Sequence, residues 1–130
     1  NIEATGEFVV NMATEALTNQ MNASSATVPN DVDEFELAGL TAEPSQLVKA
    51  PRVAESPAHM ECTFLKRVDL PSSNPAQRNE MIIGQVIGIH IRDEVLVDGL
   101  VDVTKFRPLA RLGYMQYTVV EKVFTLDRPG

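Results

Sequence analysis

Two histidines and one glutamate are the first candidates for chemistry in this sequence. His59 and Glu61 are two residues apart in a stretch with strand character, so their side chains share one face. A His-x-Glu pair can contribute to a metal site, but one pair alone more often forms a partly exposed polar pair. We therefore expect a polar pair at this position and predict no metal site.

His90 shares a predicted strand face with Gly84 and Gly88. Glycines at this spacing leave room for another backbone, a helix or a ligand, and a ligand in that space could bond His90. Close packing around a structural histidine is the more common arrangement, and we expect it here.

Cys62 is the only cysteine of the chain. It lies between Met60 and Phe64 on an apolar face, which indicates a packed thiol rather than a nucleophile. One cysteine excludes an internal disulfide and a site built from several cysteines. A reducing compartment such as the cytoplasm is expected.

The segment at residues 111–117 combines Arg111, Gly113, Tyr114 and Tyr117. Irregular segments on a rigid scaffold often carry binding residues. A loop anchored by its tyrosines is the equally plausible alternative, and the residue types leave both open.

Familiar catalytic motifs are absent from the sequence. It contains no Gly-x-Ser-x-Gly, no His-Glu-x-x-His, no phosphate loop and no Gly-x-Gly-x-x-Gly. The usual hydrolytic machinery and the doubly wound dinucleotide fold are therefore not expected, and no catalytic residue is assigned.

The elements that position these residues are mostly strands. Alternating side chains predict strands over residues 58–68 and 81–92, and both faces of the second are apolar, so both are expected to be covered. Other expected elements are a helix end at residues 2–6, a strand at 7–12, a helix capped by Thr14, a loop at 22–29, a helix at 31–38, an extended crossing at 41–57, a turn at Asp98-Gly99, an irregular or helical stretch at 106–117 and a last strand at 119–126.

Composition limits the functions that the chain can have. Its 130 residues carry a net charge of −7 with scattered cations, which argues against a nucleic-acid partner. The longest apolar stretch, residues 81–91, is interrupted by polar residues and glycines, so no membrane span is expected. One β-rich domain fits the length and the number of strands.

Several segments occur in the order seen in one known family. They are EFVVN at residues 7–11, MNA at 21–23, DEFELAGLT at 33–41, PRVAESP at 51–57, EC at 61–62, GQV at 84–86 with His90, and PLARLG at 108–113. Together they cover nearly the whole chain, which resembles the flavin reductase-like FMN-binding split-barrel family (flavoredoxin-like proteins).

The resemblance implies a mostly β, FMN-binding split β-barrel with short helices, acting as a homodimer. It implies an FMN-dependent oxidoreductase of the flavin reductase type, with NADH or NADPH as co-substrate; the alternative is a non-enzymatic electron carrier or flavin-binding module. A cofactor-free β-barrel interaction module is a third possibility. We expect residues 1–130 to form one such domain without its N-terminal part, which in the family includes a Lys-Asp-Thr-like segment that contacts the flavin phosphate.

The resemblance also indicates which residues would hold the cofactor. Asn11, Met12 and Ala13 end the first predicted strand, where backbone groups would bond the polar edge of the flavin. The expected flap against the flavin or the nicotinamide consists of Arg111, Gly113 and Tyr117. Many relatives have a second glycine where this chain has Tyr114, a departure that would narrow the pocket or change what stacks on the flavin.

Overall fold

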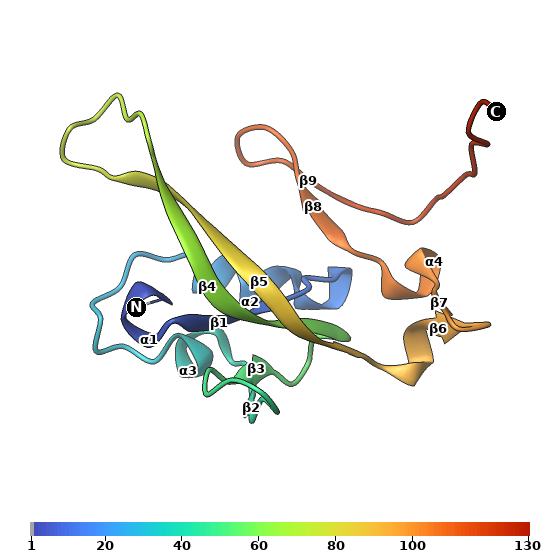
Figure 1. Cartoon of the computed structure of the whole chain (residues 1–130), viewed down its shortest axis with the longest axis horizontal. Coiled ribbons are helices and arrows are strands. Elements are labelled where there is room, and N and C mark those ends of the chain that lie inside the picture. The colour runs from blue at the N-terminus through green and yellow to red at the C-terminus, as the bar shows by residue number, and fades with distance from the viewer. Residues whose placement is uncertain (1) are drawn as a thin grey trace.

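A three-stranded antiparallel sheet forms the centre of the molecule (Figure 1). The computed structural model describes residues 2–130. The strands are β1 (Glu7–Asn11), β4 (Ala58–Leu70) and β5 (Asn79–Ile91), in the order β1-β4-β5. These strands confirm the short strand predicted at 7–12 and the two predicted from alternating side chains, although β4 and β5 form a longer hairpin than expected.

The helices are short and lie beside the sheet. They are α1 (Ile2–Thr5), the 3-10 turn η1 (Glu15–Leu17), α2 (Thr18–Ser24) and α3 (Glu34–Ala38). Gly39 ends α3 at φ 70°, as predicted, but the helix begins at Glu34 rather than at residue 31. Its cap is Asp33, whose side chain accepts a hydrogen bond from the Phe35 N–H. The helix end before Gly6 is confirmed as well.

The predicted cap at Thr14 is wrong. Its side chain makes no capping hydrogen bond, and Thr14 forms an isolated bridge with Pro108 instead. Pairing with this distant segment keeps Thr14 extended, and the chain starts its helix with a 3-10 turn. The helix also runs to Ser24, three residues into the predicted loop.

The crossing between α3 and β4 contains two short strands, β2 (Ala42–Glu43) and β3 (Arg52–Val53), which pair antiparallel. The residues between them, 44–51, are anchored to the sheet by carboxylates. The backbone N–H groups of Leu47 and Val48 donate to Glu61, and that of Lys49 donates to Glu7. The middle of the predicted crossing, residues 44–51, is thus fixed across the sheet, and we call these residues the strap.

Two irregularities interrupt β4. The register against β5 shifts between Glu61 and Cys62, and again between Phe64 and Lys66. A bulge places one extra residue in a strand and breaks the strict alternation of faces. The extra residue is Ile87 of β5 at the first shift and Leu65 of β4 at the second, so β4 keeps its alternation from Glu61 to Cys62. Both of these side chains are buried. Cys62 is a packed thiol as predicted, and burial raises its pKa.

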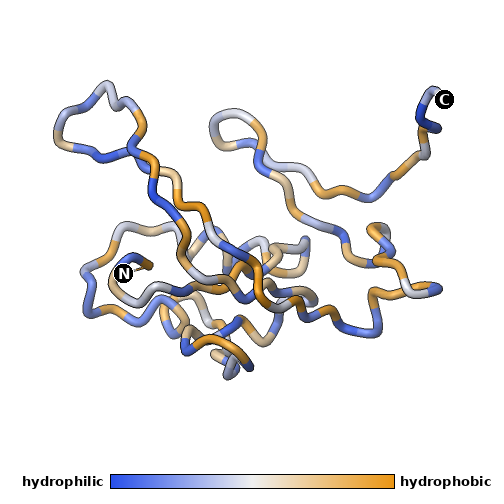
Figure 2. Tube along the Cα trace, in the orientation of Figure 1, coloured by the Kyte–Doolittle hydropathy of each residue, from blue (hydrophilic) through white to orange (hydrophobic). Residues whose placement is uncertain are grey.

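Both glycines of β5 lie under side chains of this chain. A methyl group at Gly88 would come within 2.8 Å of Cδ1 of Leu47, and one at Gly84 would overlap the ring of Phe8. Close packing is thus confirmed at both positions. The prediction that both glycines share one face is wrong, because Ile87 is an extra residue between them: Gly88 faces Leu47 and Glu61, and Gly84 faces Phe8. The expected cover of both faces of β5 is also incomplete, since Ile87, Ile89 and Ile91 are 42%, 62% and 36% exposed. Figure 2 shows apolar residues recurring along this strand.

The C-terminal third consists of short elements. They are η2 (Asp93–Val95), β6 (Leu96–Val97), β7 (Leu100–Val101), α4 (Val103–Phe106), β8 (Leu109–Arg111) and β9 (Tyr117–Val119). The turn predicted at Asp98-Gly99 is confirmed, with φ angles of 52° and 77°.

Two predictions for this region are wrong. Residues 106–117, expected to be irregular or helical, contain most of the β8–β9 hairpin. The strand predicted at 119–126 ends at Val119, and residues 120–130 have no regular secondary structure. Alternation is not sufficient for a strand where no neighbouring strand pairs with it, and Figure 1 shows this segment running away from the sheet. Among residues 2–130, no helix is long and apolar enough to cross a membrane.

Candidate functional site

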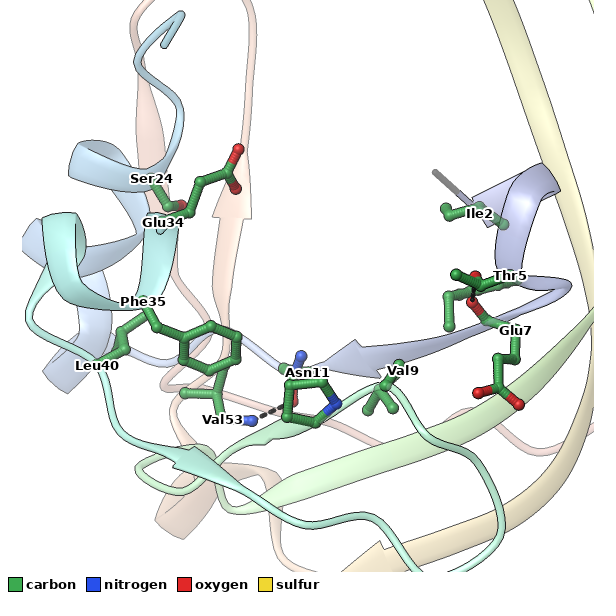
Figure 3. Close-up of a pocket in the computed structure, with 13 residues that line it drawn as sticks. Ile2, Thr5, Glu7, Val9, Asn11, Ser24, Glu34, Phe35, Leu40 and Val53 are labelled. Atoms are coloured by element: carbon green, nitrogen blue, oxygen red, sulfur yellow. Dashed lines mark hydrogen bonds between the residues drawn. The ribbon is translucent and has the colours of Figure 1, made fainter. Parts of the chain in front are cut away.

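A cavity of about 560 Å³ lies between β1, α1, α3 and the strap, within the size range of ligand sites in proteins. Figure 3 shows its lining residues, with Asn11 at the floor and Phe35 and Leu40 on one wall. Val9, Pro51 and Val53 add further apolar surface. An apolar cavity with few polar groups suits a flat, largely apolar ring that has a polar edge.

Asn11 is the best-placed polar group of this cavity. Its Oδ1 accepts a hydrogen bond of 2.8 Å from the Val53 N–H, and this contact fixes the orientation of the amide. Nδ2 has no hydrogen-bond partner among residues 2–130, and Figure 3 shows it directed into the cavity. The Asn11 side chain is therefore a pre-oriented donor for a ligand carbonyl or ring nitrogen.

Met12 and Ala13 line a smaller cavity of about 190 Å³, which shares Asn11 and Val53 with the larger one. The Met12 backbone is already used, because its N–H donates to Ala58 and its carbonyl accepts from the Ser56 hydroxyl. The Ala13 carbonyl accepts from Leu109 N–H at 3.0 Å. Of the N–H groups of Met12 and Ala13, that of Ala13 has no hydrogen-bond partner among the described residues.

The charge of the larger cavity shows which part of a ligand it can hold. Glu7 and Glu34 line it, and none of its described lining residues is cationic. A phosphate requires cations or several convergent N–H groups. The cavity thus fits the ring of a flavin, and its lining does not fit the phosphate.

The structure does not bring Arg111, Gly113 and Tyr117 to this cavity. Arg111 and Tyr117 are partners across the β8–β9 hairpin, with the guanidinium carbon 5.8 Å from the centre of the tyrosine ring. The base of the hairpin is tied to Ala13 by the Leu109 N–H, while its tip extends away from the sheet (Figure 1). In this chain the six predicted residues form two separate groups.

The sequence did not predict the buried hydrogen-bond network around Glu61. The Glu61 side chain is fully buried; its Oε1 accepts from the N–H groups of Leu47 and Val48 at 2.7 and 3.0 Å, and its Oε2 accepts from Nε2 of His90. Burial alone would raise the pKa of Glu61. The hydrogen bonds from His90 and the strap outweigh burial and lower this pKa to about 2.

His59 belongs to the same buried region. It is 4% exposed, its Nε2 donates to the Val53 carbonyl at 2.7 Å, and its ring lies edge-on to His90 at 6.5 Å. Burial lowers the pKa of His59. The expectation of a partly exposed His59–Glu61 pair is wrong, because the strap covers this face of the sheet. The interpretation of His90 as a structural histidine is supported by its bond to Glu61.

Comparison with known proteins agrees with this fold and cavity. Residues 1–110 match the family described as "Flavin reductase like domain". An uncharacterized protein of Halalkalibacterium halodurans is 33% identical over 129 residues, which are 99% of this chain and 62% of that protein. The chain thus spans less than two thirds of this relative.

Two solved structures are also similar. Component B of nitrilotriacetate monooxygenase from Bacillus cereus has a TM-score of 0.88 at 28% identity, over 97% of this chain and 62% of that one. The 2-nitrobenzoate 2-nitroreductase of Pseudomonas fluorescens has a TM-score of 0.85 at 27% identity, over 99% of this chain and 62% of that one. This chain belongs to the flavin reductase-like family and has its split-barrel fold.

Proposed function

We propose that this chain is the cofactor-binding part of an FMN-dependent oxidoreductase that moves hydride or electrons between reduced nicotinamide and flavin. Family membership supports a flavin as the ligand and an oxidoreductase as the class of protein. The observation that carries the proposal within this chain is the Asn11 amide, held by Val53 with its nitrogen directed into an apolar cavity.

When bound, the flavin supplies the redox chemistry, and the protein binds and orients it. In this proposal Nδ2 of Asn11 and the N–H of Ala13 donate hydrogen bonds to the polar edge of the ring. Phe35, Leu40 and Val53 pack against its apolar part and exclude water. We assign no catalytic residue, and we propose that NADH or NADPH approaches the exposed side of the ring.

The phosphate and the flap complete the proposal. Because the described cavity lining contains no cation, the phosphate would be held by groups outside it, as the family resemblance indicates for the N-terminal segment. Arg111, Gly113 and Tyr117 would act as a flap from the projecting hairpin, in contact with a flavin or nicotinamide of the assembled protein.

A homodimer and a cytoplasmic location are also part of this proposal. The exposed isoleucines of β5 give an apolar surface that a second subunit would cover. The free, buried thiol of Cys62 is compatible with a reducing compartment.

The proposal is tested with the purified protein that contains this chain, by its absorption spectrum and by following NADH and NADPH oxidation with FMN. Bound FMN together with nicotinamide oxidation is the expected result. Bound FMN without oxidation would identify an electron carrier instead. A colourless protein that gains no flavin spectrum when mixed with FMN would overturn flavin binding and favour the cofactor-free module.

A further inference from the structure

A second cavity, of about 490 Å³, lies where β3 meets the paired ends of β4 and β5. It shares no lining residue with the cavities around Asn11. Both histidines of the chain line it, together with Arg52, Arg92 and the carboxylate of Glu43. In a chain of net charge −7 with scattered cations, this is an unusual concentration of groups that bind polar ligands.

The arginines supply hydrogen-bond donors. The Arg52 side chain is only 17% exposed, and its Nε lies 3.3 Å from Oε2 of Glu43. The two groups of this ion pair are not oriented for a hydrogen bond. Nε of Arg52 is therefore a buried donor without a hydrogen-bond partner among the described residues. Buried donors are nearly always paired, and an unpaired one beside a cavity indicates a missing acceptor. Arg92 is 45% exposed; its Nη2 donates to the Ala54 carbonyl, and its Nη1 lies 3.5 Å from Oε1 of Glu94.

The histidines supply acceptors. Nε2 of His59 donates to a carbonyl and Nε2 of His90 donates to a carboxylate, so each of these nitrogens carries a hydrogen. A neutral imidazole with hydrogen on Nε2 presents Nδ1 as an acceptor. The cavity therefore combines cationic donors from the arginines with acceptor nitrogens from the imidazoles.

We propose that this second cavity binds a small molecule in which an oxyanion is joined to a hydroxyl donor, as in a hydroxycarboxylate or a hydrogen phosphate group. Arg52 and Arg92 hold the oxyanion through charge-assisted hydrogen bonds. Nδ1 of the histidines accepts from the hydroxyl. An oxyanion without a donor would leave these nitrogens unpaired, and a neutral alcohol would leave the arginines unpaired.

The two imidazoles give a direct readout that does not depend on flavin. Long-range ¹H–¹⁵N NMR of the unmodified protein, with the ring signals assigned through His59→Gln and His90→Gln, follows titrations at constant pH and ionic strength. The probes form two matched pairs: lactate against propionate, and hydrogen phosphate against sulfate. Only the first member of each pair carries a hydroxyl at neutral pH.

We expect saturable shifts of both rings with lactate, with hydrogen phosphate, or with both, and dissociation constants about tenfold larger for propionate and sulfate. Lactate alone would identify a carboxylate ligand, and phosphate alone a phosphoryl ligand. Arg52→Gln should weaken binding, whereas Arg78→Gln, at an arginine that is 70% exposed and outside the cavity, should not.

Absence of saturable shifts with both hydroxyl-bearing probes would overturn the proposal. Equal binding of propionate and lactate, and of sulfate and hydrogen phosphate, would also overturn it, as would unchanged binding in a folded Arg52→Gln variant. If that variant does not fold, the comparison of the matched probes in the unmodified protein decides the question.

Discussion

Oε2 of Glu61 on β4 is hydrogen-bonded to Nε2 of His90 on β5, inside a sheet face that the strap covers. The other oxygen of the same carboxylate holds the strap at Leu47 and Val48. One fully buried side chain thus connects two strands with the strap, whose residues Ala50 and Pro51 line the larger cavity. Several predictions depend on this arrangement and on the surfaces around it.

Replacing Glu61 by alanine should destabilise the fold strongly. The change leaves two backbone N–H groups and a histidine without their acceptor in a buried place, at a cost of about 2–3 kcal/mol. Glu61→Gln keeps an acceptor for the strap and should cost less. Chemical denaturation measures both variants, with the exposed Glu94→Ala as the control; equal stability of Glu61→Ala and the unmodified chain would contradict the network.

The same carboxylate predicts how stability depends on pH. Its pKa is about 2 in the folded chain and has an ordinary value of 4.5. A group with a lowered folded pKa stabilises the fold above its unfolded pKa and loses this effect as the pH falls through the folded value. Stability should therefore decrease between about pH 4.5 and pH 2. Glu61→Gln should flatten this part of the curve, and an unchanged slope would refute the role of Glu61.

Asn11→Asp should separate flavin binding from structure. An aspartate keeps the acceptor for the Val53 N–H and replaces the Nδ2 donor with a second oxygen. FMN affinity should fall about tenfold while the melting temperature stays nearly constant. Asn22→Asp, on the exposed side of α2, is the matched control. An unchanged FMN dissociation constant in Asn11→Asp would remove Asn11 from the site.

Tyr117→Ala tests the proposed flap. Loss of an aromatic contact with the flavin or nicotinamide costs about 0.5–1.5 kcal/mol beyond buried area, so ligand affinity should fall several-fold. The change also removes the ring beside the Arg111 guanidinium and should lower the melting temperature slightly. A lower melting temperature with unchanged FMN and NADH parameters would show that Tyr117 serves only the hairpin.

Tyr114→Gly should stabilise the chain. Tyr114 has φ 56°, a left-handed conformation that costs a residue with a Cβ about 1 kcal/mol relative to glycine. Its side chain is 94% exposed, so little packing is lost. The control is Met115→Gly, at a position 92% exposed and without positive φ, which should not stabilise. Thermal unfolding compares the two, and a lower melting temperature for Tyr114→Gly would show that the tyrosine has a packing role.

Ile89→Lys should prevent the proposed dimer. Ile89 is 62% exposed in the middle of the apolar face of β5, and a charge there would be buried in an interface. Light scattering should show a dimer for the unmodified protein and a monomer for this variant. Leu100→Lys, on the exposed β7, is the control and should remain dimeric. A monomeric unmodified protein at micromolar concentration would contradict the dimer.

Elements whose conformation depends on neighbouring residues in the sequence were predictable. The helix before Gly39 follows from its acidic residues and the glycine at its end, and the two long strands follow from their alternating side chains. The space above Gly88 was also predictable, because a missing side chain leaves room regardless of what fills it. These signals involve neighbours in the sequence, so no distant contact was needed to interpret them.

Elements whose conformation depends on contacts between distant parts of the chain were not predictable. Residues 119–126 were predicted as a strand from their alternation, but only Val119 lies in one. Tyr117 belongs to a hairpin whose base is tied to Ala13. Thr14 resembles a helix cap but pairs with Pro108, far along the chain. In each case the conformation depends on whether a segment from another part of the chain is there to pair with it.

The sequence by itself determined the main strands and the family resemblance, and it predicted a ligand site at the end of β1. Only the tertiary structure decided that Glu61 is buried, that Asn11 offers its nitrogen to the cavity, and that one face of β5 is left exposed. The physical reason is that burial and hydrogen-bond pairing depend on groups brought together by folding. The strap reaches Glu61 from fourteen residues away along the chain, and Val53 reaches Asn11 from forty-two.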